Sequence, residues 1–229
     1  MNSSILYSRA GIATQILLST EEDYFIVDIG DGALRDLLFR KINFRKIKGI
    51  FLTHGHYDHI AGLYALLGYL RTIERKRPIN IYFPQGSKEA PQIIFAFQKN
   101  YDDLSFPIQM HEVKGGDEIE LSDLKIKIFK MRHYAAVGVN RILHPDPAVG
   151  YRFIYQGESV AISGDTGICP DLRKLIQGAD VAYIDSTLNA EEATQELLEK
   201  LHLSKENAEE MGKLAKKYIL IHRPHRLYK

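Results

Sequence analysis

The sequence predicts an α/β (α+β) protein in which mixed β-sheets are covered by helices. Short apolar runs come first, and later apolar runs alternate with segments of helical periodicity. This order is typical of sheets flanked by helices, and it excludes a helical bundle or an all-β barrel. The 229 residues fit one such domain, and no repeat or long linker divides them. We therefore expect a single domain over residues 1–229.

The first part of the chain predicts three strands and two helices. Short apolar runs predict strands at 12–18, 24–28 and 47–52. A helix is expected at 33–40, where three leucines fall on one face. A second helix is expected to begin near His59 and to carry four more leucines.

The rest of the chain predicts further strands and helices in alternation. The expected strands are 79–83, 108–113, 124–131, 150–155, 159–163, 181–185 and 218–221. The expected helices are 88–99, 190–201 and 205–217. The residues 135–148 are expected to form a loop.

Composition and charge exclude several classes of protein. The formal net charge of +1 gives no overall field that would favour nucleic acid or an anionic membrane. No apolar run approaches the roughly 20 residues that cross a bilayer, so we expect no membrane association. The N-terminal residues lack a secretion signal, and the lone Cys169 fits a reducing compartment. We therefore expect a cytoplasmic protein.

Side chains that bind metals follow the carboxyl ends of four predicted strands. These side chains are His54, His133, Asp165 and His222. If the sheets align these strand ends, the four groups converge on one rim, where sites are usually built.

The loop that begins at His54 is the most informative segment. The run His54-Gly55-His56-Tyr57-Asp58-His59 places four potential ligands in six residues. Imidazole and carboxylate together suit Zn²⁺ best, with Mn²⁺ or Fe as alternatives. The three later candidates bring the set to seven ligands, enough for two divalent ions that share a carboxylate. By contrast, single histidines such as His111 and His144 are expected to be ordinary core or surface residues.

This run after a short apolar strand resembles the metal motif of the metallo-β-lactamase superfamily, and the resemblance covers almost the whole chain. Asp28 resembles the family's early aspartate, which sits behind the metal loop. The resemblance implies an αββα four-layer sandwich of two mixed β-sheets flanked by helices. It further implies one ion on His54, His56 and His133, a second on Asp58, His59 and His222, and Asp165 as the bridge.

Within the superfamily, the chain most resembles the branch of ribonuclease Z and related phosphodiesterases. The segments Gly150-Tyr151-Arg152-Phe153 and His202-Leu203-Ser204 carry this likeness. In that branch the histidine at the position of His202 assists catalysis without binding metal, although the residue also fits a helix entry with Ser204 as N-cap. The chain departs from the branch in Asp185-Ser186-Thr187, which replaces Glu-Ala-Thr, and in having no room after His133 for an arm that grips tRNA.

The expected substrate is a small phosphodiester, a nucleotide or a nucleic-acid end. Basic residues occur in two bursts, at 71–77 and 213–229, which are usually solvated helix faces. The second burst surrounds His222, so Arg223, His225 and Arg226 are candidates to border the site, as is the loop 140–147. Cations there would favour phosphate. No stacking platform or extended basic stripe is visible that would indicate a large folded RNA. Family analogy suggests a homodimer.

The expected reaction is hydrolysis by a hydroxide that bridges two metal ions and attacks phosphorus in line. Asp58 and His202 are the expected catalytic residues, and His202 protonates the leaving oxygen. A thioester or lactone hydrolase of the glyoxalase II kind would use the same ligands and stays open. A di-iron oxidoreductase is less favoured, because such relatives usually have Glu at the position of His56 and carry a flavin domain. A non-catalytic metal-binding protein is disfavoured because the ligand set is intact.

Overall fold

The computed structural model describes residues 1–137 and 141–224 of the chain. The chain divides into two compact units, Met1–Glu112 and Val113–Lys229. The expectation of a single domain therefore stays a prediction. Among the described residues, none of the helices has the length and apolar character needed to cross a membrane.

The first unit is built on a mixed six-stranded sheet of order β1-β2-β3-β4-β5-β6. The first three strands form an antiparallel meander, whereas β3, β4 and β5 run parallel. The strands are β1 Asn2–Arg9, β2 Ala13–Ser19, β3 Tyr24–Val27, β4 Ile47–Phe51, β5 Ile79–Pro84 and β6 Ile108–Val113.

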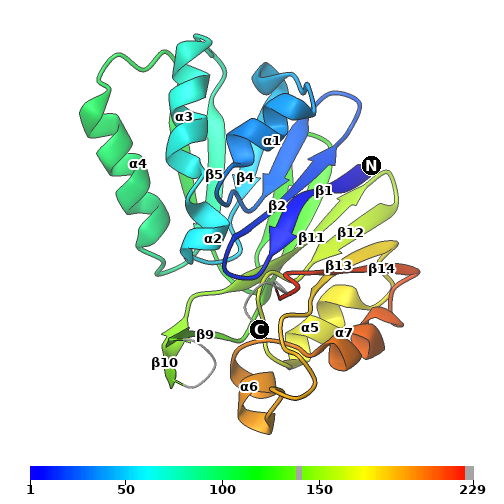
Figure 1. The fold of residues 1–229 in the computed structure, drawn as a ribbon. Coiled ribbons are helices and arrows are strands. Elements are labelled where there is room, and N and C mark those ends of the chain that lie inside the picture. The colour runs from blue at the N-terminus through cyan, green and yellow to red at the C-terminus, as the bar shows by residue number, and fades with distance from the viewer. Residues whose placement is uncertain (138–140, 225–229) are drawn as a thin grey trace. The chain divides into compact units, whose positions relative to one another are not determined.

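Helices cover one face of this sheet (Figure 1). They are α1 Ala33–Phe39, α2 Tyr57–Ile60, α3 Leu63–Thr72 and α4 Glu89–Asn100, with a short 3₁₀ turn at Phe44–Lys46. Leucines of α1 and α3 and apolar residues of α4 form one buried core with Ile26, Ile50 and Ile81 of the sheet. The burial of these apolar side chains holds the helices against the sheet and fixes where β3 and β4 end.

The second unit is built on another mixed six-stranded sheet, of order β14-β13-β12-β11-β8-β7. The parallel pairs β12–β13 and β13–β14 and the antiparallel pairs around β11 give β8, β12, β13 and β14 one direction. Their carboxyl ends therefore lie at one edge of the sheet. The strands are β7 Glu118–Leu121, β8 Leu124–Lys130, β11 Val149–Tyr155, β12 Glu158–Ile162, β13 Val181–Asp185 and β14 Lys217–Ile221.

Three helices and a separate hairpin complete the second unit (Figure 1). Helices α5 Pro170–Ile176 and α7 Lys205–Gly212 contribute to a buried core with Ala161, Ala182 and Leu220 of the sheet. Helix α6 Gln195–Lys200 packs near the two-stranded sheet of β9 His133–Val137 and β10 Arg141–Asp146.

The predicted fold class is confirmed, since both sheets are mixed and carry helices, but several elements differ from expectation. The strands β1, β7, β9 and β10 and the helix α5 were not predicted. Helix α6 begins late because the Thr194 hydroxyl caps it, accepting from the Leu197 N–H at 3.3 Å. Helix α7 ends at Gly212, five residues early, because Lys217 already belongs to β14.

Candidate active site

The loop His54–His59, which carries the four potential metal ligands and is called the metal-type loop below, follows β4. Its backbone is tied to neighbouring segments: the His59 carbonyl accepts from the Ile29 N–H at 2.7 Å. The Asp58 carboxylate accepts from the Gly11 N–H at 2.9 Å, and the Tyr57 hydroxyl donates to the Gly11 carbonyl at 2.6 Å. These bonds hold the loop in one conformation before any ligand binds.

Two glycines allow the close approach that these bonds require. A Cβ atom on Gly30 would collide with the backbone carbonyl of Asp58, and one on Gly62 would collide with the Gly30 carbonyl. Only glycine leaves room for the end of β3 to touch the loop at both points. The glycine at 62 also separates α2 from α3, which the sequence predicted as one helix beginning near His59.

Asp28 lies behind the loop and holds two of its histidines. Its carboxylate accepts from the Thr53 N–H at 2.7 Å, the Thr53 hydroxyl at 2.8 Å and the His59 Nδ1 at 2.7 Å. The Thr53 hydroxyl lies 3.1 Å from the Nδ1 of His54. Because a carboxylate only accepts, Nδ1 of His59 carries its proton, which leaves Nε2 as the ring nitrogen suited to bind a metal. This is the place that the family resemblance predicted for Asp28.

The three histidines of the loop lie together. The ring centroid of His54 is 4.1 Å from that of His59 and 4.6 Å from that of His56. Asp58 adds a carboxylate whose Oδ2 lies 4.0 Å from the Nε2 of His59. Three imidazoles and a carboxylate at this spacing are a donor set that suits divalent metal ions.

In the second unit, the carboxyl ends of the parallel strands bring together the expected side chains. Asp165 follows β12, Asp185 ends β13 and His222 follows β14, while His133 comes shortly after β8. Asp165, Asp185, His202 and His222 each offer a nitrogen or oxygen within 4.8 Å of the others. Within this unit, the expected convergence of strand ends therefore holds for Asp165 and His222.

Asp185 organises this second group much as Asp28 organises the first. Its Oδ2 accepts from the Nδ1 of His202 at 2.9 Å, and its Oδ1 accepts from the Thr187 hydroxyl at 2.5 Å. The Thr187 hydroxyl in turn accepts from the Nδ1 of His222 at 2.7 Å. The Asp185 side chain is fully buried, whereas 16% of the His202 side chain is exposed.

The remaining predicted ligands of the second unit also contact neighbouring groups. The Nδ1 of His133 donates to the Leu201 carbonyl at 3.0 Å, and its ring centroid lies 5.1 Å from that of His202. Asp165 lies 3.4 Å from the Nδ1 of His222. His222 has a φ of 51°, and Asp28 in the first unit has a φ of 56°, so two site residues adopt the left-handed conformation.

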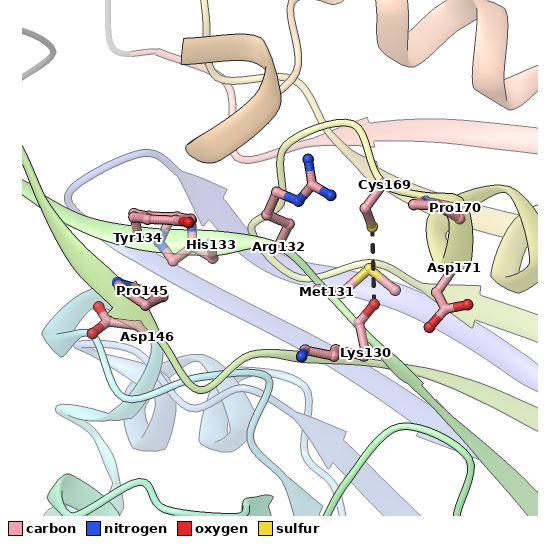
Figure 2. A pocket seen from close by; sticks show the side chains of 10 residues that line it. All are labelled: Lys130, Met131, Arg132, His133, Tyr134, Pro145, Asp146, Cys169, Pro170 and Asp171. Carbon is pink, nitrogen blue, oxygen red and sulfur yellow. Dashed lines mark hydrogen bonds between the residues drawn. The ribbon is translucent and has the colours of Figure 1, made fainter. Parts of the chain in front are cut away.

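A pocket of about 390 Å³ lies beside His133 in the second unit (Figure 2). Tyr134, Pro145 and Asp146 line one end and Cys169, Pro170 and Asp171 the other, with Lys130, Met131 and Arg132 between them. The volume is that of a small-molecule site. The Cys169 thiol donates weakly to the Lys130 carbonyl at 3.9 Å and is not part of a nucleophile–base pair in the described chain.

His111 and His144 contact side chains that do not belong to these groups. His111 stacks on Tyr82 with centroids 4.6 Å apart, and burial lowers its pKa. His144 is exposed and pairs with Asp146 at 3.2 Å. Arg223 is exposed, whereas His225 and Arg226 lie outside the described residues.

The sequence analysis did not predict that Thr53, Asp185 and Thr187 hold histidines of the site by hydrogen bonds. Asp185 stands at the carboxyl end of a predicted strand, which is the signal that identified Asp165 and His222. The two threonines have no such signal, because a hydroxyl that bridges a carboxylate and a ring shows itself only in three dimensions.

Comparison with known proteins matches residues 26–222 to the beta-lactamase superfamily domain, which covers both units. The ribonuclease Z of Methanothermobacter thermautotrophicus is 29% identical to this chain, over 96% of the chain and 83% of the relative.

Solved structures give the same fold. Human tRNase Z, short form, superimposes with a TM-score of 0.81 at 23% identity, over 99% of this chain and 94% of that one. The metallo-β-lactamase fold protein YhfI from Bacillus subtilis gives a TM-score of 0.75 at 17% identity, over 97% of this chain and 86% of that one. At these identities, the structures establish the metallo-β-lactamase fold.

Proposed function

The chain belongs to the β-lactamase superfamily, and from this we propose that it is a metal-dependent phosphodiesterase that hydrolyses RNA in the manner of a ribonuclease Z. The observation that carries the proposal is the bond of 2.9 Å from His202 to Asp185, in one group with Asp165 and His222. A proton donor fixed beside metal-type ligands is what cleavage of a phosphodiester requires.

We propose that seven residues hold two divalent ions: His54, His56, Asp58, His59, His133, Asp165 and His222. The donor sets of both units support this, because each unit combines imidazole with carboxylate. Zn²⁺ suits such a set best, with Mn²⁺ or Fe as alternatives. When bound, the ions supply Lewis acidity and neutralise negative charge on the phosphate.

His202 acts on the leaving group. Its Nδ1 donates to Asp185, so the ring is oriented and Nε2 is the atom that transfers a proton. The leaving oxygen takes that proton as its bond to phosphorus breaks. Because 16% of the His202 side chain is exposed, water can reprotonate the ring. Asp185 does not touch the substrate in this scheme; it is a positioning residue.

The substrate in this proposal is an RNA end or a shorter phosphodiester. The names of the relatives, ribonuclease Z and tRNase Z, support RNA. Between His133 and Asp165 the chain has the short strands β9 and β10 and the hairpin β11–β12. This segment contains no inserted arm among its described residues, so other parts of the chain must contact the substrate. The pocket beside His133 has room for one substituent of the phosphate.

Activity of the zinc-loaded protein on three substrates tests the proposal. We expect turnover of bis-p-nitrophenyl phosphate and of a short RNA, and loss of both on His202→Gln with the metal content unchanged. Turnover of a thioester without turnover of either phosphodiester would overturn the proposal in favour of a glyoxalase II-like hydrolase.

A further inference from the structure

Two basic segments that are distant in the sequence meet on the first unit, away from the metal-type loop. Arg45, Lys46 and Lys48 come from the 3₁₀ turn and the start of β4, and Lys76 and Arg77 from the turn before β5. They line two neighbouring hollows of about 320 and 400 Å³, which share Arg45, Lys46, Arg75 and Arg77. We call Arg45, Lys46, Lys48, Lys76 and Arg77 the basic patch; Arg75 is not part of it.

Arg75 fixes the frame of this patch. It is fully buried, and its guanidinium donates to the carbonyls of Phe44, Ile47, Arg77 and Pro78 at 2.6–3.0 Å. Burial, together with the charge of Arg77, lowers the pKa of Arg75 to about 10, so it stays charged at neutral pH. The Arg75 side chain thus joins both basic segments. Their backbones are held in fixed positions, and so are the cations that they carry.

The patch has cations in excess. Lys48, Lys76 and Arg77 form no ion pair with any described residue, and Lys46 has only a long contact of 3.9 Å to Glu22. Acidic neighbours are Glu22, Asp23 and Glu74, fewer than the five cations. The burst at 71–77 is therefore not one solvated helix face: Arg71 pairs with Asp103, Arg75 is buried, and only the last two residues join the patch.

The patch and the metal-type loop lie at opposite ends of β4. Lys48 stands near the start of this strand and His54 follows its end, so about 15–20 Å of extended chain separates them. A small phosphodiester cannot reach both. A ligand that contacts both must therefore be a longer polymer with a regular row of phosphates, such as a nucleic-acid duplex of several base pairs.

We propose that the basic patch binds the phosphate backbone of an RNA substrate at a distance from the bond that is cut; the identity of the ligand as RNA rests on the proposed function. Unpaired cations on a rigid frame attract a polyanion and release its counterions. The substrate would thus carry a base-paired body beyond its reactive end.

Salt-dependent binding of a labelled RNA hairpin with a stem of about ten base pairs tests this. The test variant is Lys48→Gln, Lys76→Gln, Arg77→Gln, which leaves Arg75 and its carbonyl partners intact. The matched control is Lys99→Gln, Lys114→Gln, Lys213→Gln, which removes three exposed cations that likewise form no ion pair with described residues. All proteins in the titration also carry His202→Gln, so that the RNA stays whole.

We expect the test variant to bind the hairpin roughly tenfold more weakly at low salt, with a slope of log Kd against log salt lower by about two. The control should change both quantities much less. When His202 is kept, the unmodified protein, the test variant and the control variant should hydrolyse bis-p-nitrophenyl phosphate equally.

Equal weakening in test and control variants would overturn the proposal. A patch-dependent preference for poly-glutamate over RNA would also overturn it, because the partner would then be an acidic protein. Absence of diester hydrolysis in all three proteins would instead count against the proposed function, since the binding measurement needs no turnover.

Discussion

Asp28 in the first unit and Asp185 in the second each accept hydrogen bonds from one threonine hydroxyl and one histidine Nδ1. In each unit the same threonine hydroxyl contacts a further histidine, His54 or His222. The difference lies in the histidine that the carboxylate holds directly. His59 is fully buried in the metal-type loop, whereas His202 is partly exposed.

Under the proposed function, one local arrangement serves two purposes. A buried ring fixed by a carboxylate is suited to ligate a metal, because its orientation and tautomer are set. A ring fixed in the same way but open to water is suited to exchange protons. The following substitutions separate these two purposes.

The largest effect is expected for His59→Ala. Loss of a metal ligand should lower diester turnover about a thousandfold, which corresponds to about 4 kcal/mol of transition-state stabilisation. One equivalent of metal should be lost as well, measured by elemental analysis. His144→Ala, an exposed histidine outside the group, is the control. Full activity of His59→Ala would contradict the two-ion assignment.

Asp28→Asn should act mainly on metal affinity. The amide retains an acceptor for the Thr53 N–H but loses the oxygen that receives both the Thr53 hydroxyl and His59. Loss of such a supporting carboxylate typically weakens metal binding by about 10–100-fold. Competition with a zinc chelator measures this, and turnover should recover at saturating zinc. Unaltered zinc affinity would show that Asp28 does not orient a ligand.

Asp185→Asn should act on turnover at constant metal content. The amide keeps an oxygen for Thr187, which supports His222, but places an NH₂ group against Nδ1 of His202. We expect the kcat for bis-p-nitrophenyl phosphate to fall by about 100-fold, the lower end of the range for loss of a general acid or base. If this variant lost zinc as Asp28→Asn does, the two carboxylates would serve the same purpose and the comparison would fail.

The smallest effects are expected for Thr53→Val and Thr187→Val, which keep the shape and remove the hydroxyl. Each should weaken zinc binding by about tenfold, the lower end for supporting residues. Thr187→Val should have the larger effect, because its bond to His222 is 2.7 Å against 3.1 Å for Thr53 and His54. The reverse order in chelator competition would mean that these bonds do not set ligand strength.

The sequence predicted those elements whose stability comes from apolar side chains. The strands β3, β4, β12 and β13 are compact apolar runs and were predicted within two residues. Strand β1 was missed because Asn2, Ser3 and Ser4 give no apolar pattern; it forms by backbone pairing with β2. Helix α5 was not predicted, although Pro170 stands in its first turn, where proline is favoured.

The candidate site was predictable to the extent that ligands follow strands. His133, Asp165 and His222 were found in this way, and in the second unit the last two lie together with His202. The threonine bridges and the basic patch were not predictable, because they join residues that are far apart in the chain. Lys48 and Lys76, for example, belong to segments that are joined by the bonds of Arg75 and by the pairing of β4 with β5.

The left-handed backbone of Asp28 and His222 has an evolutionary consequence. A side chain in this conformation costs about 1 kcal/mol or more that glycine would avoid. Both side chains are buried, and their hydrogen bonds to Thr53, His59 and Thr187 outweigh this cost, because glycine would leave those partners unsatisfied in the interior. Directed evolution that screens only for heat resistance should therefore not accumulate glycine at position 28 or position 222.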